Sequence, residues 1–117
     1  MVDDQWWICQ ALHDSLVGDG HTVECAGDGK EALAAFRKAR FDLVITDHAM
    51  PVMSGEHLAA AVKRSRPDVP VIMMTGLGAM LEEPIIKRGL ADRVIHKPFT
   101  ISAVREAVTA AMTAPPR

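Results

Sequence analysis

The sequence predicts a doubly wound α/β domain built on a parallel sheet, and three observations favour this fold class. Short apolar segments alternate with amphipathic helical patterns, and the loops between them are short. The apolar parts of two segments, 41–47 and 70–75, show no polar alternation, which is typical of strands buried on both faces. No repeat or linker interrupts the pattern, so we expect one domain over residues 1–113 and a frayed tail at 114–117.

Four strands are expected after a very short first one. Only Met1 and Val2 precede the acidic pair Asp3 and Asp4, so the first strand is nearly missing. The later strands are indicated by apolar and β-branched runs that end in turn residues. They are expected at residues 21–26, 41–47, 70–75 and 93–97.

Five helices are expected, because apolar residues recur at helical spacing in five segments. Ser54 is a favourable N-cap for the third helix. Pro84 falls inside the fourth segment and would remove a backbone hydrogen bond, so that helix is expected to be short and to begin near residues 82–84. The other four helices are expected at residues 6–17, 31–38, 54–64 and 100–112.

The composition limits the class of protein. A chain of 117 residues, 49% of them hydrophobic, can bury a sufficient core without a disulfide or a structural metal. Cys9 and Cys25 have neither CxxC nor Cys/His spacing, and no signal peptide or membrane-spanning apolar run is present, so a cytoplasmic location is expected. With a net charge of -2, the chain lacks the excess of basic residues that is typical of proteins that bind nucleic acid. Neither nucleic acid nor a membrane is therefore an expected partner.

Reactive side chains stand at the carboxyl ends of the predicted strands, which meet at one edge of an open α/β sheet. Carboxylates forced together there repel one another unless a divalent cation neutralises them, and oxygen ligands without His or Cys favour Mg²⁺. An ammonium group and a hydroxyl beside them suit phosphoryl transfer, with Asp47 as the nucleophile. The residues concerned are Asp3, Asp4, Asp47, Thr75 and Lys97.

Four short motifs at these positions together resemble the receiver domain of two-component response regulators. They are DD at 3–4, DHAMPVMSG at 47–55, TG at 75–76 and KPF at 97–99. The resemblance covers nearly the whole chain. It implies a flavodoxin-like sheet of five parallel strands in the order 2-1-3-4-5, with helices on both faces and, in this chain, a truncated first strand.

The resemblance also implies roles for individual residues. Asp47 would accept a phosphoryl group from a histidine kinase or a histidine phosphotransfer protein, and Thr75 and Lys97 would bind the phosphoryl oxygens. Mg²⁺ would be held by Asp3, Asp4, Asp47 and the backbone carbonyl of Ala49. The Lys97–Pro98 bond would be cis. No enzymatic activity is expected beyond Mg²⁺-dependent self-phosphorylation and slow self-dephosphorylation.

Three features depart from the family pattern: the short first strand, Pro84 in the fourth helical segment, and Val94. The short first strand would leave rows of unpaired backbone groups in the middle of the sheet, so either the true start lies upstream or the domain compensates by dimerisation or rearrangement. Val94 stands where many receivers carry a switching Tyr or Phe. His48 follows Asp47 and could act as a proton donor, but a solvated loop histidine is the expected reading.

Two functional classes remain open after this comparison, with a third ranked last. The first is a phosphorylatable receiver without an output domain of its own, either a stand-alone regulator or the receiver of a hybrid kinase. The second is a pseudo-receiver, a protein-binding module that is not phosphorylated. A phosphohydrolase is less favoured because Ala49 occupies the position, two residues after Asp47, where such enzymes usually need an acid/base carboxylate.

Overall fold

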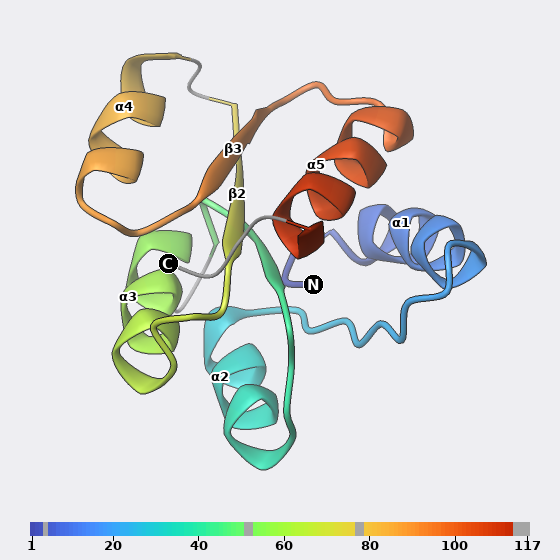
Figure 1. The fold of residues 1–117 in the computed structure, drawn as a ribbon, viewed down its shortest axis with the longest axis horizontal. Coiled ribbons are helices and arrows are strands. Elements are labelled where there is room, and N and C mark those ends of the chain that lie inside the picture. Colours follow the sequence, from blue (N-terminus) through green and yellow to red (C-terminus); the bar gives the residue numbers. More distant parts are fainter. Residues whose placement is uncertain (4, 51–52, 77–78, 114–117) are drawn as a thin grey trace.

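Three parallel strands form the centre of the fold, with helices on both faces (Figure 1). The computed structural model describes residues 1–3, 5–50, 53–76 and 79–113. The strands are β1 (Val44–Asp47), β2 (Val71–Thr75) and β3 (Arg93–His96), paired in that order. The helices are α1 (Trp6–Gly18), α2 (Gly29–Lys38), α3 (Gly55–Ser65), α4 (Ala79–Lys87) and α5 (Ile101–Thr113).

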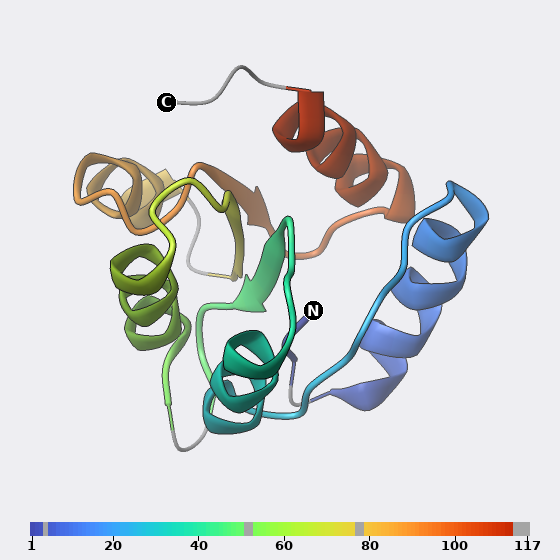
Figure 2. The same ribbon diagram turned by 60° about the horizontal axis from the view of Figure 1, so that its bottom comes forward.

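Alternate residues of the strands supply two separate cores. Val71 and Met73 of β2 belong to a buried cluster with α2 and α3, whereas Ile72 and Met74 belong to a second cluster with α1 and α5. Successive side chains of a strand point to opposite faces, so the continuous apolar run of β2 serves both cores. Figure 2 shows α1 and α5 on one side of the sheet and α2 and α3 on the other, which confirms the predicted doubly wound layering.

Side-chain caps fix where three helices begin. The carboxylate of Asp28 accepts a hydrogen bond from the Glu31 amide at 2.8 Å before α2, and the Ser54 hydroxyl accepts one from the His57 amide at 3.2 Å before α3. Thr100 caps α5 in the same way. Each cap satisfies an amide that has no partner within the helix, so the predicted starts are correct to within two residues.

The first two predicted strands are reduced to single-residue bridges. Val2 pairs in parallel with Ala26 on one side and with Thr46 on the other, and its amide donates to the Ile45 carbonyl at 2.7 Å. The five predicted strand segments therefore lie side by side in the expected order 2-1-3-4-5, in which β1, β2 and β3 of the structure are segments 3, 4 and 5. The prediction of a strand over 21–26 was wrong, because a first strand this short offers that segment hardly any backbone to pair with.

Two other boundaries differ from expectation. β1 begins at Val44 rather than at residue 41, again beside the missing part of the first strand. α4 begins at Ala79 and contains Pro84, so the expectation of a start near residues 82–84 was wrong. Proline removes only one intrahelical hydrogen bond there, and Ile85 beside it is buried in the core, which favours the continued helix. The tail at 114–117 lies outside the described residues.

Charged pairs join α3 to the sheet and α5 to the end of α1. The ammonium of Lys63 on α3 contacts the Asp92 carboxylate at 2.7 Å, and that carboxylate also accepts the Val71 amide at 2.8 Å at the start of β2. Arg105 of α5 holds Asp19, just after α1, through two hydrogen bonds that lower the pKa of the Asp19 carboxyl.

In the part of the chain that is described, no helix is long and apolar enough to cross a membrane.

A disulfide joins Cys9 of α1 to Cys25, sixteen residues later. The spacing of the two cysteines did not predict this bond, because they meet only when α1 folds back beside residues 21–26. Cys9 is buried and its partner lies next to Ala26, where the second segment meets Val2. The disulfide therefore links the segment 21–26, which pairs with Val2 only through Ala26, to α1.

We expect reduction of this disulfide to destabilise the domain. Closing a loop of this size removes conformational entropy from the unfolded chain, worth about 2–4 kcal/mol. Thermal melts with and without reductant should show the loss. The double variant Cys9→Ser/Cys25→Ser is the matched control: it should melt at the lower temperature and ignore the reductant. Equal melting temperatures for the oxidised and fully reduced protein would contradict the expectation.

Candidate phosphoryl-acceptor site

The carboxyl ends of three parallel strands bring the predicted reactive residues together. Asp47 is the last residue of β1, Thr75 is the last of β2, and Lys97 directly follows β3. The Lys97 amide donates to the Thr75 carbonyl at 2.7 Å, which fixes the end of β3 against that of β2. Asp47 is only 6% exposed and Thr75 is fully buried. The convergence expected from the strand ends is confirmed.

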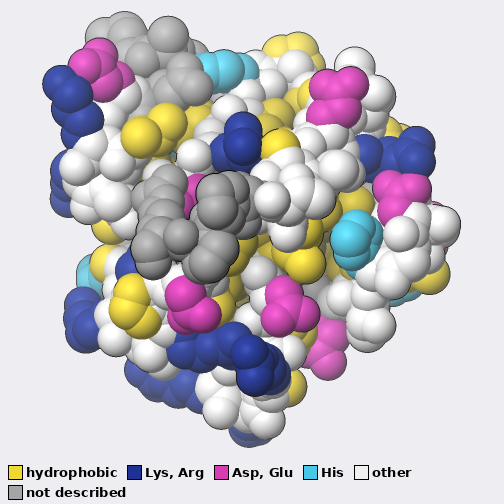
Figure 3. Space-filling view, in the orientation of Figure 1, with side chains coloured by type: hydrophobic (Ala, Val, Ile, Leu, Met, Phe, Trp, Pro, Cys, Tyr) yellow, Lys and Arg dark blue, Asp and Glu magenta, His cyan; other side chains and the backbone are white. Residues whose placement is uncertain are grey.

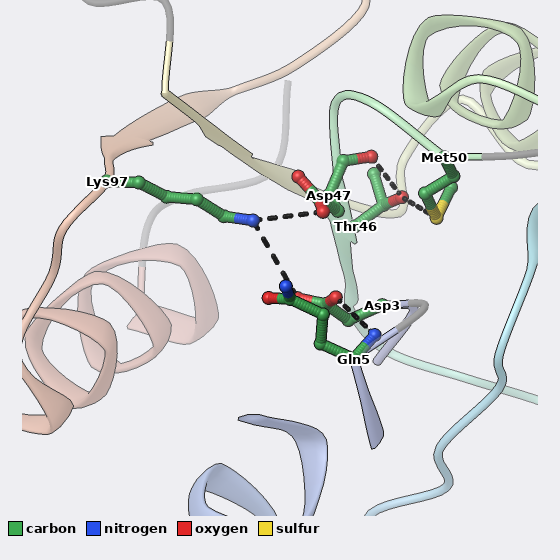
Figure 4. Close-up of polar contacts among 6 residues, drawn as sticks. All are labelled: Asp3, Gln5, Thr46, Asp47, Met50 and Lys97. Carbon is green, nitrogen blue, oxygen red and sulfur yellow. Dashed lines mark hydrogen bonds and ion pairs between the residues drawn. The ribbon is translucent and has the colours of Figure 1, made fainter. Parts of the chain in front are cut away.

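Lys97 lies between two carboxylates (Figure 4). Its Nζ is 2.9 Å from Asp47 Oδ2 and 4.0 Å from Asp3 Oδ2. Asp3 is 1% exposed, and its Oδ1 accepts the backbone amide of Gln5 at 2.9 Å. Asp3 and Asp47 together carry two negative charges against the single positive charge of Lys97. This arrangement favours a further cation nearby.

A surface hollow of about 440 Å³ opens over these groups. Asp47, Thr75 and Lys97 line it from three neighbouring strand ends. Sequence reasoning did not find Gln5, although it directly follows the acidic pair. The lining residues are Gln5, Asp47, His48, Ala49, Thr75, Gly76 and Lys97.

His48 is more enclosed than the sequence suggested. Its side chain is 15% exposed, and its Nε2 lies 3.5 Å from the Glu56 carboxylate on α3. Glu56 in turn lies 3.5 Å from Arg88, just after α4. The expectation of a solvated histidine was wrong, because α3 begins beside Asp47 and places Glu56 opposite the ring. His48 therefore links the hollow to two helices.

Gly55 permits the tight turn that follows Asp47. Its amide donates to the His48 carbonyl at 2.9 Å, so the chain folds directly back on the strand end. A Cβ atom at Gly55 would collide with the Asp47 carbonyl oxygen. That oxygen also accepts the Thr46 hydroxyl at 3.0 Å (Figure 4). Only glycine allows α3 to start this close to the Asp47 carbonyl.

A family model of the response regulator receiver domain matches residues 1–109. The chain belongs to this family. Among curated relatives, the transcriptional regulatory protein TcrA of Mycobacterium tuberculosis is 33% identical over 101 residues, which are 86% of this chain and 40% of that protein. The response regulator FleR of Pseudomonas aeruginosa is 32% identical over 109 residues, 92% of this chain and 23% of that protein. The receiver chain thus spans less than half the length of these relatives.

Solved receiver structures share the fold over almost the entire chain. The receiver domain of NtrX from Brucella abortus has a TM-score of 0.88 and 29% identity, with 97% of each chain covered. The response regulator TrrA from Thermotoga maritima, solved in complex with Mg²⁺ and BeF, has a TM-score of 0.82 and 29% identity, with 94% of each chain covered. The cis Lys97–Pro98 bond that the resemblance implied is present here.

The donor set of this receiver suits Mg²⁺. The described candidates are the buried carboxylate of Asp3, the carboxylate of Asp47 and the backbone carbonyl of Ala49, all oxygen ligands of the kind that this ion prefers. Asp4, the third predicted carboxylate, lies outside the described residues. Among the residues that are described, no group of three His, Cys, Asp or Glu side chains could hold a metal. The chemistry of the donors fits, with Asp4 as the remaining predicted ligand.

Replacing Gly55 with alanine should disturb both stability and site. The added Cβ overlaps the Asp47 carbonyl, so either α3 or the end of β1 must move, at a cost of about 1–3 kcal/mol. Chemical denaturation would measure it. Gly18→Ala is the matched control, because an added Cβ there meets nothing within 4 Å and alanine suits the end of α1. Equal stability of the two variants would contradict this account of the turn.

Proposed function

We propose that this receiver accepts a phosphoryl group on Asp47 from a histidine kinase or a histidine phosphotransfer protein. One observation carries the proposal: the Asp47 carboxylate lies at the floor of a hollow, 2.9 Å from the Lys97 ammonium and beside the end of β2 at Thr75. These are the acceptor, cationic and hydroxyl groups that phosphoryl transfer requires within reach of one phosphorus atom.

The transfer moves one phosphoryl group between two side chains. A carboxylate oxygen of Asp47 attacks the phosphorus of a phosphohistidine in line with the departing ring nitrogen. The new bond is O–P, the broken bond is N–P, and the imidazole leaves with the electron pair and takes up a proton. The Lys97 ammonium and Thr75 hydroxyl stabilise the negative equatorial oxygens, since preorganised donors act strongly in a partly water-excluded site.

Mg²⁺ is the proposed cofactor, and charge explains the need for it. The two carboxylates of Asp3 and Asp47 face the single ammonium of Lys97, so negative charge is already in excess. A phosphoryl group would add further negative charge to the same hollow. When bound, the ion would neutralise this charge and draw the acceptor and phosphoryl oxygens together. Asp3, Asp4, Asp47 and the Ala49 carbonyl are its proposed ligands.

The proposed output is a change in protein binding. The formal net charge of -2 does not favour nucleic acid as a direct partner, and the face drawn in Figure 3 carries acidic side chains close to a group of basic ones at its lower edge. A homodimer is one possible assembly for such signalling. We place the protein in the cytoplasm, where thiols are kept reduced, so the Cys9–Cys25 bond would form there only under oxidising conditions.

The competing function is a pseudo-receiver that binds partners without being phosphorylated. The observation that favours it is the first strand, which is reduced to one bridged residue, Val2, directly before Asp3. A weakly held Asp3 would make a poor metal ligand. Binding of Mg²⁺ therefore separates the two functions.

Mg²⁺ should raise the melting temperature of the wild-type chain. At a hundredfold excess over Kd the gain is about 2.7 kcal/mol, because the ion binds the folded state alone. Asp3→Asn and Asp47→Asn should each lose most of the shift. Asp68→Asn, an exposed carboxylate before β2 at the opposite edge of the sheet, should keep it. The absence of any shift in the wild type would favour the pseudo-receiver.

A small phosphodonor with Mg²⁺ should add one phosphoryl group to the wild-type chain. Intact mass spectrometry would detect the adduct, and a chelator should prevent its formation. Asp47→Asn, which keeps the shape of the side chain but lacks the nucleophilic oxygen, should gain nothing. If this variant is modified as much as the wild type, the assignment of Asp47 is wrong. A folded wild type that binds Mg²⁺ yet stays unmodified would contradict the phosphorylation proposal itself.

A further inference from the structure

The disulfide between Cys9 and Cys25 has one protected and one accessible end. Cys9 lies in α1 and is 3% exposed. Cys25 is exposed, and residues 21–25, to which it belongs, form no helix or strand. Cys25 also lines a hollow of about 300 Å³ beside α2. Because thiol–disulfide exchange begins with a thiolate that must reach one sulfur atom of the bond, a reagent meets Cys25 first.

The disulfide lies directly beside the backbone pairing of the amino-terminal residues. Cys25 precedes Ala26, whose amide donates to the Met1 carbonyl at 2.9 Å and whose carbonyl accepts the Asp3 amide at 3.1 Å. On the other side, Cys9 Sγ lies 3.8 Å from the same Met1 carbonyl oxygen. The two cysteines therefore flank the hydrogen bonds that hold the backbone of Asp3.

The two ends of the disulfide differ in how firmly they are held. α1 is anchored by Leu12 and Leu16, which are buried in the core that this helix shares with α5. The segment 21–26 returns alongside α1 (Figure 2) and pairs with Val2 only through Ala26. A single bridge restrains a segment weakly, because a local opening costs little where few contacts must break. The covalent bond to a fixed helix therefore restrains mainly this segment.

We propose that Cys9 and Cys25 form a reversible redox modification site, which reacts with small-molecule disulfides through Cys25. The closed bond holds residues 21–26 against Met1 and Asp3, and opening the bond loosens that pairing. In the cytoplasm proposed above, thiols are kept reduced, so the open form is the resting state and an excess of a small disulfide closes the bond. The site thereby transmits the thiol–disulfide balance to the segment that carries Asp3.

Closure takes two exchange steps with a small disulfide, RSSR. The Cys25 thiol loses its proton to solvent, and the thiolate attacks one sulfur of RSSR, so that a Cys25–SR bond forms and RS⁻ leaves with the electron pair of the broken S–S bond. The Cys9 thiolate, which has likewise lost its proton, then attacks the Cys25 sulfur and displaces the second RS⁻. Two protein thiols are oxidised, and RSSR is reduced to two RSH, which take up the two protons.

Oxidised glutathione tests the point of entry in single-cysteine variants. In the folded state, Cys9→Ser should gain one glutathione on the exposed Cys25, whereas Cys25→Ser should stay unmodified at the buried Cys9. Intact mass spectrometry measures both adducts. In denaturant both variants should react, which shows that the Cys9 thiol is competent once it is accessible. Equal modification of the two folded variants would overturn the proposal.

The reduced wild-type chain supplies a test that needs no substitution. Oxidised glutathione should remove two hydrogen atoms from the folded chain as the Cys9–Cys25 bond closes, and reduced glutathione in excess should restore them. A folded wild type that stays reduced, or that keeps glutathione on Cys25 without closing the bond, would refute the site.

Amide hydrogen exchange tests whether the bond acts locally. The reporters are the Asp3 and Ala26 amides, and the reference is the His48 amide, which donates to the Met74 carbonyl at 2.8 Å within the sheet. Reduction should lower the protection of both reporters relative to the reference by at least about tenfold. The double variant Cys9→Ser/Cys25→Ser should show the reduced pattern at every glutathione ratio. An equal loss of protection at all three amides would reveal a cross-link that only raises overall stability, and would overturn the proposal.

A consequence for the carboxylate of Asp3 rests on the proposed function. The oxidised chain should bind Mg²⁺ at least about threefold more tightly than the reduced chain in titration calorimetry, because a larger fraction of molecules has Asp3 in place. The double cysteine variant should bind the ion equally in both buffers. Equal affinity of the oxidised and reduced wild type would contradict the redox coupling. If neither form binds Mg²⁺, the proposed function is wrong, whereas the redox site is still decided by the adducts and the amide exchange.

Discussion

The backbone hydrogen bonds of residues 1–3 hold the two halves of this fold together. Met1 and Asp3 bond to residues 24–26 and Val2 bonds to β1, so the backbone pairing between the 21–26 segment and the sheet runs through residues 1–3. The same three residues set the position of the Asp3 carboxylate beside Lys97. Fold and site therefore depend on one short segment, and the disulfide at Cys25 supports it from the side.

Much of this architecture could be predicted from local patterns. The apolar runs before Asp47 and Thr75 are strands because nothing polar interrupts them, and parallel pairing then places both side chains at one edge. Ser54 predicted a helix start because capping is local chemistry. The segment 21–26 could not be judged in this way, since strand formation there depends on a partner elsewhere in the chain. The disulfide and the contact between His48 and Glu56 likewise required the folded chain.

The base of the site is formed by buried strand ends, and its other side opens to the surface. Buried apolar residues of β1 and β2 fix the backbone of Asp47 and Thr75, and Gly55 closes the turn directly over the Asp47 carbonyl. Lys97 stands outside this core, one residue beyond β3, and its long side chain crosses to Asp47. A backbone fixed in this way, with one long cationic side chain reaching Asp47, suits the proposed phosphoryl acceptor, in which Lys97 would contact phosphoryl oxygens.

The truncated strand also bears on how tightly the site can bind a cation. In the proposed Mg²⁺ site, Asp3 would be a competent ligand only while residues 1–3 are paired with both neighbours. The apparent affinity for the ion would then be the intrinsic affinity multiplied by the fraction of molecules in which that pairing is intact. An interaction that orders this segment, such as the Cys9–Cys25 bond, would raise that fraction and with it the apparent affinity. Pairing of residues 1–3 and loading of the proposed site would therefore be thermodynamically coupled.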